Sequence, residues 1–320
     1  MVQTNSMRCC QSANVLVICG PTASGKSNIA MEIAHQIHGE IICMDSMQIY
    51  GKMDVGTAKP TLVEQERIPH HLFGFVPPSA SYSVAEYRED ARKTIADVLS
   101  RGKVPILVGG TGLYLHALRY EMAMGNTPKD DLYRRQLEAR ASTQEGKEQL
   151  YQKLMEVDRQ RAAQLHPNDA RRVIRALEIF HVTGMPMSKQ QMHLCSHDGF
   201  SFYVAGITLD RAVLYDRINR RVLSMIKQGL VDEVRQLISS GVADDAQSMQ
   251  GIGYKEVISY LNGSLTLEEC IALIQLNSRH YAKRQWTWFR REEGITWYDA
   301  ANENVVSDII THFVKSKEEE

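Results

Sequence analysis

The sequence predicts an α/β fold in which helices flank a parallel β-sheet, with a helical segment inserted into the chain. Three observations support this prediction. Short apolar runs alternate with amphipathic runs along residues 15–108, an order typical of parallel sheets. A glycine-rich loop joins the first apolar run to the first amphipathic run. Apolar strand patterns then disappear from about residue 120 to residue 199 and return near residue 202.

The predicted elements follow one another in a regular order along the chain. The apolar runs predicted to be strands lie at residues 15–19, 40–44, 104–108 and 202–208. The amphipathic runs predicted to be helices lie at residues 28–38, 84–101, 169–181, 210–228 and 267–291. Ser83 and Glu86 have the spacing of a capping box, and Asp210 is a typical N-cap residue. The order strand, helix, strand therefore repeats through the first part of the chain.

The loop after the first predicted strand matches the phosphate-binding pattern G-x-x-x-x-G-K-[ST]. Its residues are Gly20, Pro21, Thr22, Ala23, Ser24, Gly25, Lys26 and Ser27. In such a loop the backbone N–H groups surround a polyphosphate, the lysine reaches its terminal phosphates, and the serine hydroxyl can ligate Mg²⁺. The pattern indicates a P-loop NTPase-like core, but it does not distinguish ATP from another diphosphate ester.

These predictions divide the chain into a core, an insertion and two termini. The P-loop-like catalytic core is expected at residues 13–120 and 201–300, and the helical insertion at residues 121–200. Residues 1–12 and 301–320 are expected to be flanking termini. The early residues show no signal peptide or membrane span, and the cysteines form no C-x-x-C pair. We therefore expect a cytoplasmic protein.

Three turns of the core carry side chains suited to chemistry. Ligands of parallel sheets bind beyond the carboxyl ends of the strands, so the phosphate loop, the turn at Asp45 and the glycine turn at Thr111 should converge on one crevice. Asp45 could act as a general base, bind a metal ion or cap the turn that follows it. Thr111 could bind a phosphate oxygen or only shape a tight connection. Arg217 and Arg221 share one helix face, where they either bind a polyanion or form solvated ion pairs.

Nucleic-acid binding is indicated by local basic clusters rather than by overall charge, since the formal net charge is -1. The basic residues Arg279, Lys283 and Arg290 fall along one stripe of a predicted helix, with Trp286 among them. The alternative is that the aromatic residues of this helix belong to the core beside a solvated charged face. A second cluster of arginines lies in the predicted insertion at residues 171–175.

Taken together, these segments resemble the bacterial tRNA dimethylallyltransferases, also called tRNA isopentenyltransferases. The matching segments are residues 20–27, 45–50, 53–60, 109–114, 175–178, 253–255 and 283–288. The resemblance implies transfer of a dimethylallyl group from dimethylallyl diphosphate to N6 of adenine 37 in tRNA, with release of diphosphate. It also implies that the base is flipped out of its stack. The chain lacks the Cys/His module that some relatives carry after the position of Cys270.

The resemblance also implies roles for individual residues. Asp45, Thr111 and Arg217 are expected to be catalytic, with Asp45 accepting the proton of the adenine amine and the other two stabilising the leaving diphosphate. The expected diphosphate-binding residues are Gly20, Thr22, Ala23, Ser24, Gly25, Lys26, Ser27 and Arg221, with Ser27 also the ligand of Mg²⁺. The expected tRNA contacts are Ser46, Met47, Gln48, Arg171, Arg172, Val173, Ile174, Arg175, Gln250, Gly251, Ile252, Gly253, Tyr254, Lys255, Lys283, Arg284, Gln285, Trp286, Thr287, Trp288, Phe289 and Arg290.

The expected partners are dimethylallyl diphosphate and the anticodon stem-loop of tRNA, with Mg²⁺ as cofactor. A monomer without membrane association is expected. Two other functions remain compatible with the same motifs. A small-metabolite or nucleotide kinase would place ATP in the phosphate loop, and a non-catalytic RNA-binding protein would retain the loop without using Asp45.

Overall fold

The computed structural model describes residues 13–121, 130–189, 193–194 and 200–318. The chain forms two compact units. Among the described residues, one unit comprises residues 13–119 and 200–318, and the other comprises the described residues between 120 and 194. Each unit is described below by itself.

The first unit is built on a six-stranded sheet with the order β3-β2-β4-β1-β7-β8. The strands are β1 (Ala13–Cys19), β2 (Gly39–Cys43), β3 (His70–His71), β4 (Val104–Gly109), β7 (Phe200–Thr208) and β8 (Ile295–Asp299). Every neighbouring pair is parallel, and β1 lies between β4 and β7. The predicted α/β fold with a parallel sheet is confirmed.

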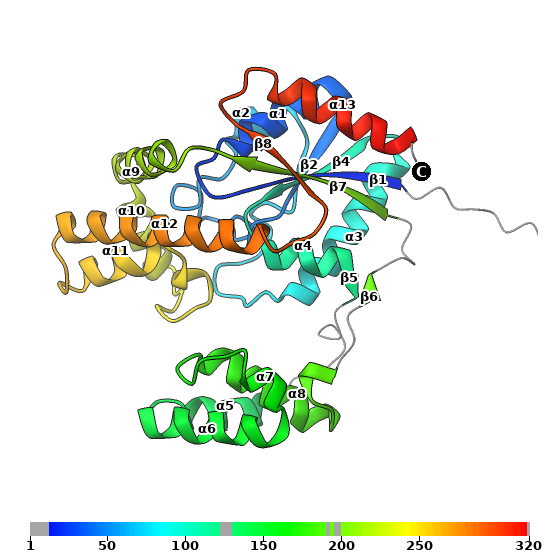
Figure 1. Ribbon diagram of the computed structural model, residues 1–320. Helices are drawn as coiled ribbons and strands as arrows, with labels where there is room; N and C mark the ends of the chain where they lie inside the picture. Colours follow the sequence, from blue (N-terminus) through cyan, green and yellow to red (C-terminus); the bar gives the residue numbers. More distant parts are fainter. Residues whose placement is uncertain (1–12, 122–129, 190–192, 195–199, 319–320) are drawn as a thin grey trace, which may run out of the picture. The chain divides into compact units, whose positions relative to one another are not determined.

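Helices cover both faces of this sheet (Figure 1). The helices are α1 (Lys26–Ile37), α2 (Leu62–Arg67), α3 (Val84–Ser100), α4 (Gly112–Arg119), α9 (Arg211–Lys227), α10 (Leu230–Ser239), α11 (Tyr254–Leu261), α12 (Leu267–Phe289) and α13 (Val305–Glu318). Val15 and Val17 of β1 face the core under α3, α4 and α12, whereas Leu16 and Ile18 face the core under α1 and α13. The alternation of side chains along a strand thus fills two cores.

Two strands of the six-stranded sheet were not predicted, and they are its two edge strands. β3 consists only of His70 and His71, a pair that shows no apolar pattern. β8 is only partly buried, which weakens the hydrophobic signal of its sequence. The predicted capping box at Ser83 and Glu86 is present at the start of α3. No described helix is long and apolar enough to cross a membrane.

The second unit is mainly helical. Its elements are β5 (Tyr120–Glu121), α5 (Asp131–Arg140), α6 (Gln144–Val157), α7 (Arg159–Ala162), α8 (Ala170–Thr183), the 3-10 helix η1 (Met187–Lys189) and β6 (His193–Leu194). Leu150, Leu154 and Leu177 lie in its hydrophobic core. The fully buried carboxylate of Glu178 on α8 accepts hydrogen bonds from Arg134 and Arg175 at 2.9 and 2.7 Å. The unit therefore has a core of its own and a buried ion-pair network.

Candidate active site

Three loops that follow β1, β2 and β4 meet at the carboxyl edge of the sheet, as the topology requires. A side chain from α12 joins two of them. The N–H of Thr22 in the phosphate loop donates to Oε1 of Gln285 at 2.8 Å, and Nε2 of Gln285 donates to the carbonyl of Gly110 at 2.9 Å. A Cβ atom on Gly110 would lie 2.1 Å from the same nitrogen. Gln285 is therefore a buried clamp between the phosphate loop and the glycine turn.

The phosphate loop packs directly against the neighbouring strand. Gly20 has a φ of 152°, and a Cβ atom there would lie 2.7 Å from the carbonyl oxygen of Ile207 in β7. The Ser24 hydroxyl is fully buried and has no hydrogen-bond partner among the described residues. A buried, unpaired donor within a loop of this pattern is suited to bind a phosphate oxygen.

Burial changes the titration of the loop lysine. The Nζ of Lys26 donates to the carbonyl of Pro21 at 3.2 Å. Burial lowers the pKa of Lys26 to about 8, against the opposing attraction of Asp45, and the charge of Arg221 lowers it further. Lys26 thus lies close enough to Asp45 and Arg221 to respond to their charges.

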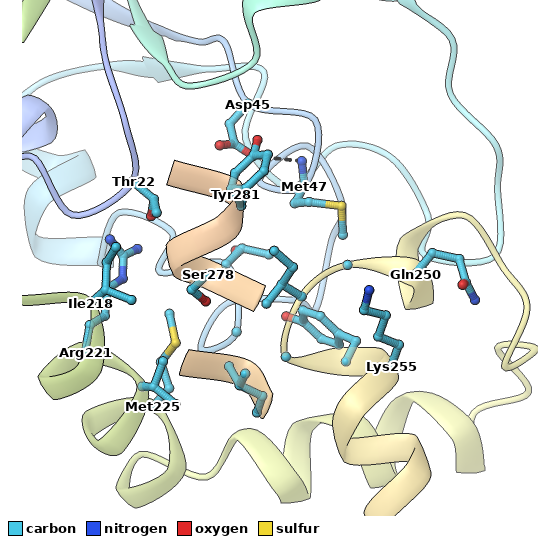
Figure 2. A pocket seen from close by; sticks show the side chains of 18 of the residues that line it. Thr22, Asp45, Met47, Ile218, Arg221, Met225, Gln250, Lys255, Ser278 and Tyr281 are labelled. Carbon is cyan, nitrogen blue, oxygen red and sulfur yellow. Dashed lines mark hydrogen bonds between the residues drawn. The ribbon is translucent and has the colours of Figure 1, made fainter. Parts of the chain in front are cut away.

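Asp45 caps the turn after β2 and also lines a cavity. Its Oδ1 accepts the N–H groups of Met47 at 2.9 Å and Gln48 at 3.3 Å, the first of which is drawn in Figure 2. The capping alternative is therefore correct for one carboxylate oxygen, and it is compatible with a catalytic role for the other. Oγ1 of Thr111 accepts the N–H of Ser46 at 3.0 Å. Thr111 therefore holds the turn that carries Asp45.

The two arginines of α9 lie beside the phosphate loop and the cavity. A Cβ atom on Gly25 would lie 3.6 Å from Nη1 of Arg217, which places this guanidinium next to the loop. Arg221 lines the cavity, and burial lowers its pKa while the negative charge of Asp45 opposes the shift. One helix face thus brings two positive charges to the phosphate loop and Asp45.

The cavity has a volume of about 330 Å³ and combines a polar end with apolar walls. Thr22, Asp45 and Arg221 supply polar groups. The apolar lining residues include Ile218, Val222 and Met225 of α9, Ile252, and Ile274 of α12. Figure 2 shows Ile218, Arg221 and Met225 on one side, facing Gln250 and Lys255 across the cavity. Of these apolar residues, only Ile252 was predicted as a site residue. The apolar spacing along α9 was a signal that could have found Ile218, Val222 and Met225.

Tyr281 also lines the cavity without having been predicted as a site residue. It lies one helical turn before Gln285 on α12, so the two side chains share a face. Burial raises the pKa of Tyr281, and the neighbouring charge of Asp45 raises it further. Its hydroxyl therefore stays protonated beside the Asp45 carboxylate.

The structure brings together one group of the predicted tRNA contacts. The predicted contacts that line the cavity are Ser46, Met47, Gln250, Gly251, Ile252, Gly253, Tyr254, Lys255 and Arg284. The Gln48 side chain instead donates to the carbonyls of Thr57 and Ala58, both at 3.0 Å. Its amide is thus engaged within the protein.

Other predicted contacts are not among the residues that line this cavity. Those with exposed side chains are Lys283, Thr287, Trp288 and Arg290 at the end of α12, and Arg171 and Arg172 on α8. The Arg290 guanidinium lies 4.8 Å from the ring centre of the half-buried Trp286. Arg279 of the predicted basic stripe donates to Oδ1 of Asn219 at 2.7 Å.

Four residues that were predicted to contact tRNA have buried side chains, so this prediction is corrected for them. Val173 and Ile174 belong to the core of the helical unit, and Phe289 belongs to the core of the first unit. Gln285 is the clamp described above. These side chains are enclosed by protein because they lie on the inward faces of their helices, so they present no surface to RNA. The alternative that the aromatic residues belong to the core is correct for Phe289, whereas Trp288 is 39% exposed.

Comparisons with known proteins find similarity along nearly the whole chain. The IPP transferase family model matches residues 48–292, and the isopentenyl transferase family model matches residues 13–69. A tRNA dimethylallyltransferase of Bacillus mycoides is 45% identical over 302 residues, which cover 94% of this chain and 95% of that protein. A protein of the same name from Halalkalibacterium halodurans is 44% identical, and the match covers 96% and 98% of the two chains.

Two solved structures are also similar. The tRNA isopentenylpyrophosphate transferase of Bacillus halodurans has a TM-score of 0.71 at 42% identity, covering 96% of this chain and 98% of the other. A eukaryotic dimethylallyltransferase acting on tRNA has a TM-score of 0.80 at 32% identity, covering 95% of this chain and 80% of the other. The shared fold thus extends to eukaryotic proteins.

Proposed function

Because the chain belongs to the tRNA dimethylallyltransferase family, we propose a specific way in which its cavity carries out the reaction of that family. As a member, the chain is a prenyltransferase that transfers a dimethylallyl group to tRNA. The proposed donor is dimethylallyl diphosphate, and the proposed acceptor is N6 of adenine 37. The cavity that joins Thr22 and Asp45 to apolar walls is the observation that carries this proposal.

The donor fits the two halves of the site. Its diphosphate would accept hydrogen bonds from the loop N–H groups and the unpaired Ser24 hydroxyl, and it would pair with Lys26 and the α9 arginines. Its five-carbon group would lie against Ile218, Val222 and Met225 of the cavity wall. An apolar wall next to a phosphate loop suits an isoprenoid diphosphate better than the triphosphate of a kinase substrate.

The acceptor amine needs a base. The lone pair of an adenine amine is delocalised into the ring, so a carboxylate within hydrogen-bond reach has to accept a proton as the new C–N bond forms. We assign this role to Asp45, whose Oδ1 is held by two backbone N–H groups. The allylic C–O bond breaks as the C–N bond forms, and the bonding electrons leave with the diphosphate.

The leaving diphosphate gains negative charge in the transition state. Lys26, Arg217 and the loop N–H groups would stabilise this charge, and the position of Arg217 next to the loop supports this role. Thr111 would contribute by holding the Asp45 turn, since its Oγ1 accepts a backbone hydrogen bond from Ser46. The role first expected for Thr111, direct contact with a phosphate oxygen, stays a prediction.

Mg²⁺ would be held by Ser27 together with the diphosphate. Ser27 is exposed in the first turn of α1, and the described residues contain no group of three His, Cys, Asp or Glu side chains that could hold a metal ion. One hydroxyl combined with phosphate oxygens and water is a ligand set typical of Mg²⁺. When bound, the ion would neutralise charge on the leaving diphosphate.

Binding of tRNA is assigned to the exposed basic side chains. We propose that Lys283 and Arg290 of α12 and Arg171 and Arg172 of α8 contact the phosphate backbone. We further propose that the enzyme acts as a monomer in the cytoplasm.

The proposed reaction is tested with unmodified tRNA, dimethylallyl diphosphate and Mg²⁺, followed by digestion and mass analysis of the nucleosides. Prenylated adenosine is the expected product. Asp45→Ala should abolish turnover while leaving tRNA binding unchanged. The matched control is Asp216→Asn, which alters an exposed carboxylate on α9. Full activity of the Asp45 variant would remove this residue as the base, and phosphate transfer from ATP without prenylated adenosine would favour a kinase.

A further inference from the structure

Glu233 on α10 accepts four hydrogen bonds from groups distant in the sequence. Its Oε2 accepts the N–H groups of Asp54 and Val55, both at 2.7 Å, and its Oε1 accepts the N–H of Gly56 at 3.0 Å. The hydroxyl of Tyr254 also donates to Oε1, at 2.7 Å. A carboxylate saturated by three consecutive backbone N–H groups and a phenol holds the loop in one conformation.

The loop held by Glu233 forms part of the cavity wall. Gly56 and Thr57 line the cavity, and so does Tyr254. A Cβ atom on Gly56 would lie 2.6 Å from the Tyr254 ring, so the loop backbone rests directly on this side chain. Glu233 itself is not among the cavity-lining residues. Glu233 therefore supports the cavity wall through hydrogen bonds to the loop backbone, without lining the cavity itself.

The same loop is tied to the turn that carries the proposed base. The Gln48 side chain donates to the carbonyls of Thr57 and Ala58 at 3.0 Å each. The N–H of Gln48 donates to Oδ1 of Asp45 at 3.3 Å. Hydrogen bonds, together with the short stretches of covalent chain between them, thus connect Glu233 through the loop and Gln48 to Asp45.

We propose that Glu233 is a positioning residue for prenyl transfer, which fixes the loop at residues 54–58 as a wall of the cavity and, through Gln48, sets the orientation of Asp45. This inference rests on the proposed function, because it assumes that Asp45 is the base. The diphosphate end of the site does not depend on this chain of hydrogen bonds. Loss of the Glu233 anchor should therefore slow turnover while leaving donor binding intact.

The test replaces the carboxylate by its isosteric amide, Glu233→Gln. The amide presents an NH₂ donor where the wild-type oxygen accepts backbone N–H groups, so at least one of these contacts is lost. A misplacement of about 1 Å at a reacting group can cost on the order of 100-fold, and we expect kcat for tRNA prenylation to fall about 10- to 100-fold. The dissociation constant for dimethylallyl diphosphate without tRNA should change less than about threefold.

Asp232→Asn is the matched control, because the neighbouring Asp232 is 68% exposed and pairs only locally with Arg235. This variant should retain the wild-type kcat. An equal loss in both variants, or a kcat of Glu233→Gln within twofold of wild type, would overturn the proposal. So would a parallel weakening of donor binding, because it would indicate general damage to the site.

A double-mutant cycle tests the route through Gln48. If Glu233 acts on Asp45 through Gln48, the loss caused by Glu233→Gln should be several-fold smaller in a Gln48→Ala background than in the wild type. Fully independent effects would refute this route. Tyr254→Phe removes a single donor, and it should lower kcat in the same direction by a smaller factor.

Hydrogen exchange supplies a readout that is independent of activity. In Glu233→Gln at least one of the amides of Asp54, Val55 and Gly56 should exchange about tenfold faster or more, because an NH₂ group replaces one of the two acceptor oxygens. Unchanged exchange at these amides would refute the anchoring even in an inactive enzyme. Absence of prenylated adenosine from the wild type, with exchange altered as expected, would instead overturn the proposed function and the positioning role built on it.

Discussion

The depressed pKa of Lys26 predicts how donor binding depends on pH. Burial lowers this pKa from 10.5 to about 8, so the ligand-free enzyme loses the lysine charge above pH 8. A diphosphate binds the charged form, and its own last proton is already lost near pH 6 to 7. By proton linkage, the dissociation constant should be nearly flat up to about pH 7.5, rise gradually through pH 8 and approach a tenfold rise per pH unit only near pH 9 and above. Between pH 7 and pH 9 the affinity should fall about tenfold.

The measurement is titration calorimetry of dimethylallyl diphosphate without tRNA, from pH 6.5 to pH 9.5. Lys26→Arg is the control, since arginine stays protonated throughout this range and should abolish the decline. Lys26→Met should bind weakly at every pH. A wild-type affinity that is constant to pH 9.5, or an equal decline in Lys26→Arg, would refute the reasoning.

The same pKa shift has a separate consequence for folding. A depressed pKa in the folded state means that the charged form of Lys26 disfavours folding. As the pH rises from about 8 toward 10.5, the folded state loses this charge before the unfolded state does, so the ligand-free protein should gain stability. This direction is opposite to the effect on donor binding.

Three further variants test other parts of the structure. Gln285→Ala should lower the free energy of unfolding by about 2 kcal/mol, because it leaves the N–H of Thr22 and the carbonyl of Gly110 without their hydrogen-bond partner. Wild-type stability in a urea titration would show that Gln285 does not hold the two loops together. Lys283→Ala should weaken tRNA binding and reduce the salt slope of log K by about 1, and an unchanged slope would mean that this side chain only faces solvent. Glu178→Gln should destabilise the helical unit by about 3 kcal/mol in chemical unfolding, whereas a change below about 0.5 kcal/mol would show that its two arginine contacts contribute little net stability.

The parts of the fold that could be predicted are those with a local signal. β1, β2 and β4 are runs of buried apolar residues, and the phosphate loop has a fixed spacing of glycines, lysine and serine. β8 could not be predicted, because its partial burial at the edge of the sheet leaves a mixed pattern. A strand that forms because it pairs with a neighbouring strand, and not because of its own apolar residues, shows no regular apolar pattern in the sequence.

The site residues divide in the same way, because some belong to a recognisable local motif and others depend on partners that are distant in the sequence. Asp45 and Lys26 could be identified from their own motifs. Gln285 lies within a segment rich in basic and aromatic residues, which suggested a surface contact, yet its partners lie 263 and 175 positions away in the chain. Glu233 has no motif of its own, and its role depends on a loop 177 to 179 positions earlier. Such roles arise from tertiary contacts that one sequence does not contain.

The clamp at Gln285 also has a consequence for the order in which the protein is made. The Thr22 N–H leaves the ribosome long before its acceptor, which is encoded 263 residues later. At 5 to 20 residues per second this interval is on the order of 10 to 50 s. During synthesis the phosphate loop and the Gly110 turn therefore exist without the side chain that joins them. The nascent chain therefore completes its diphosphate cradle only after α12 has emerged from the ribosome.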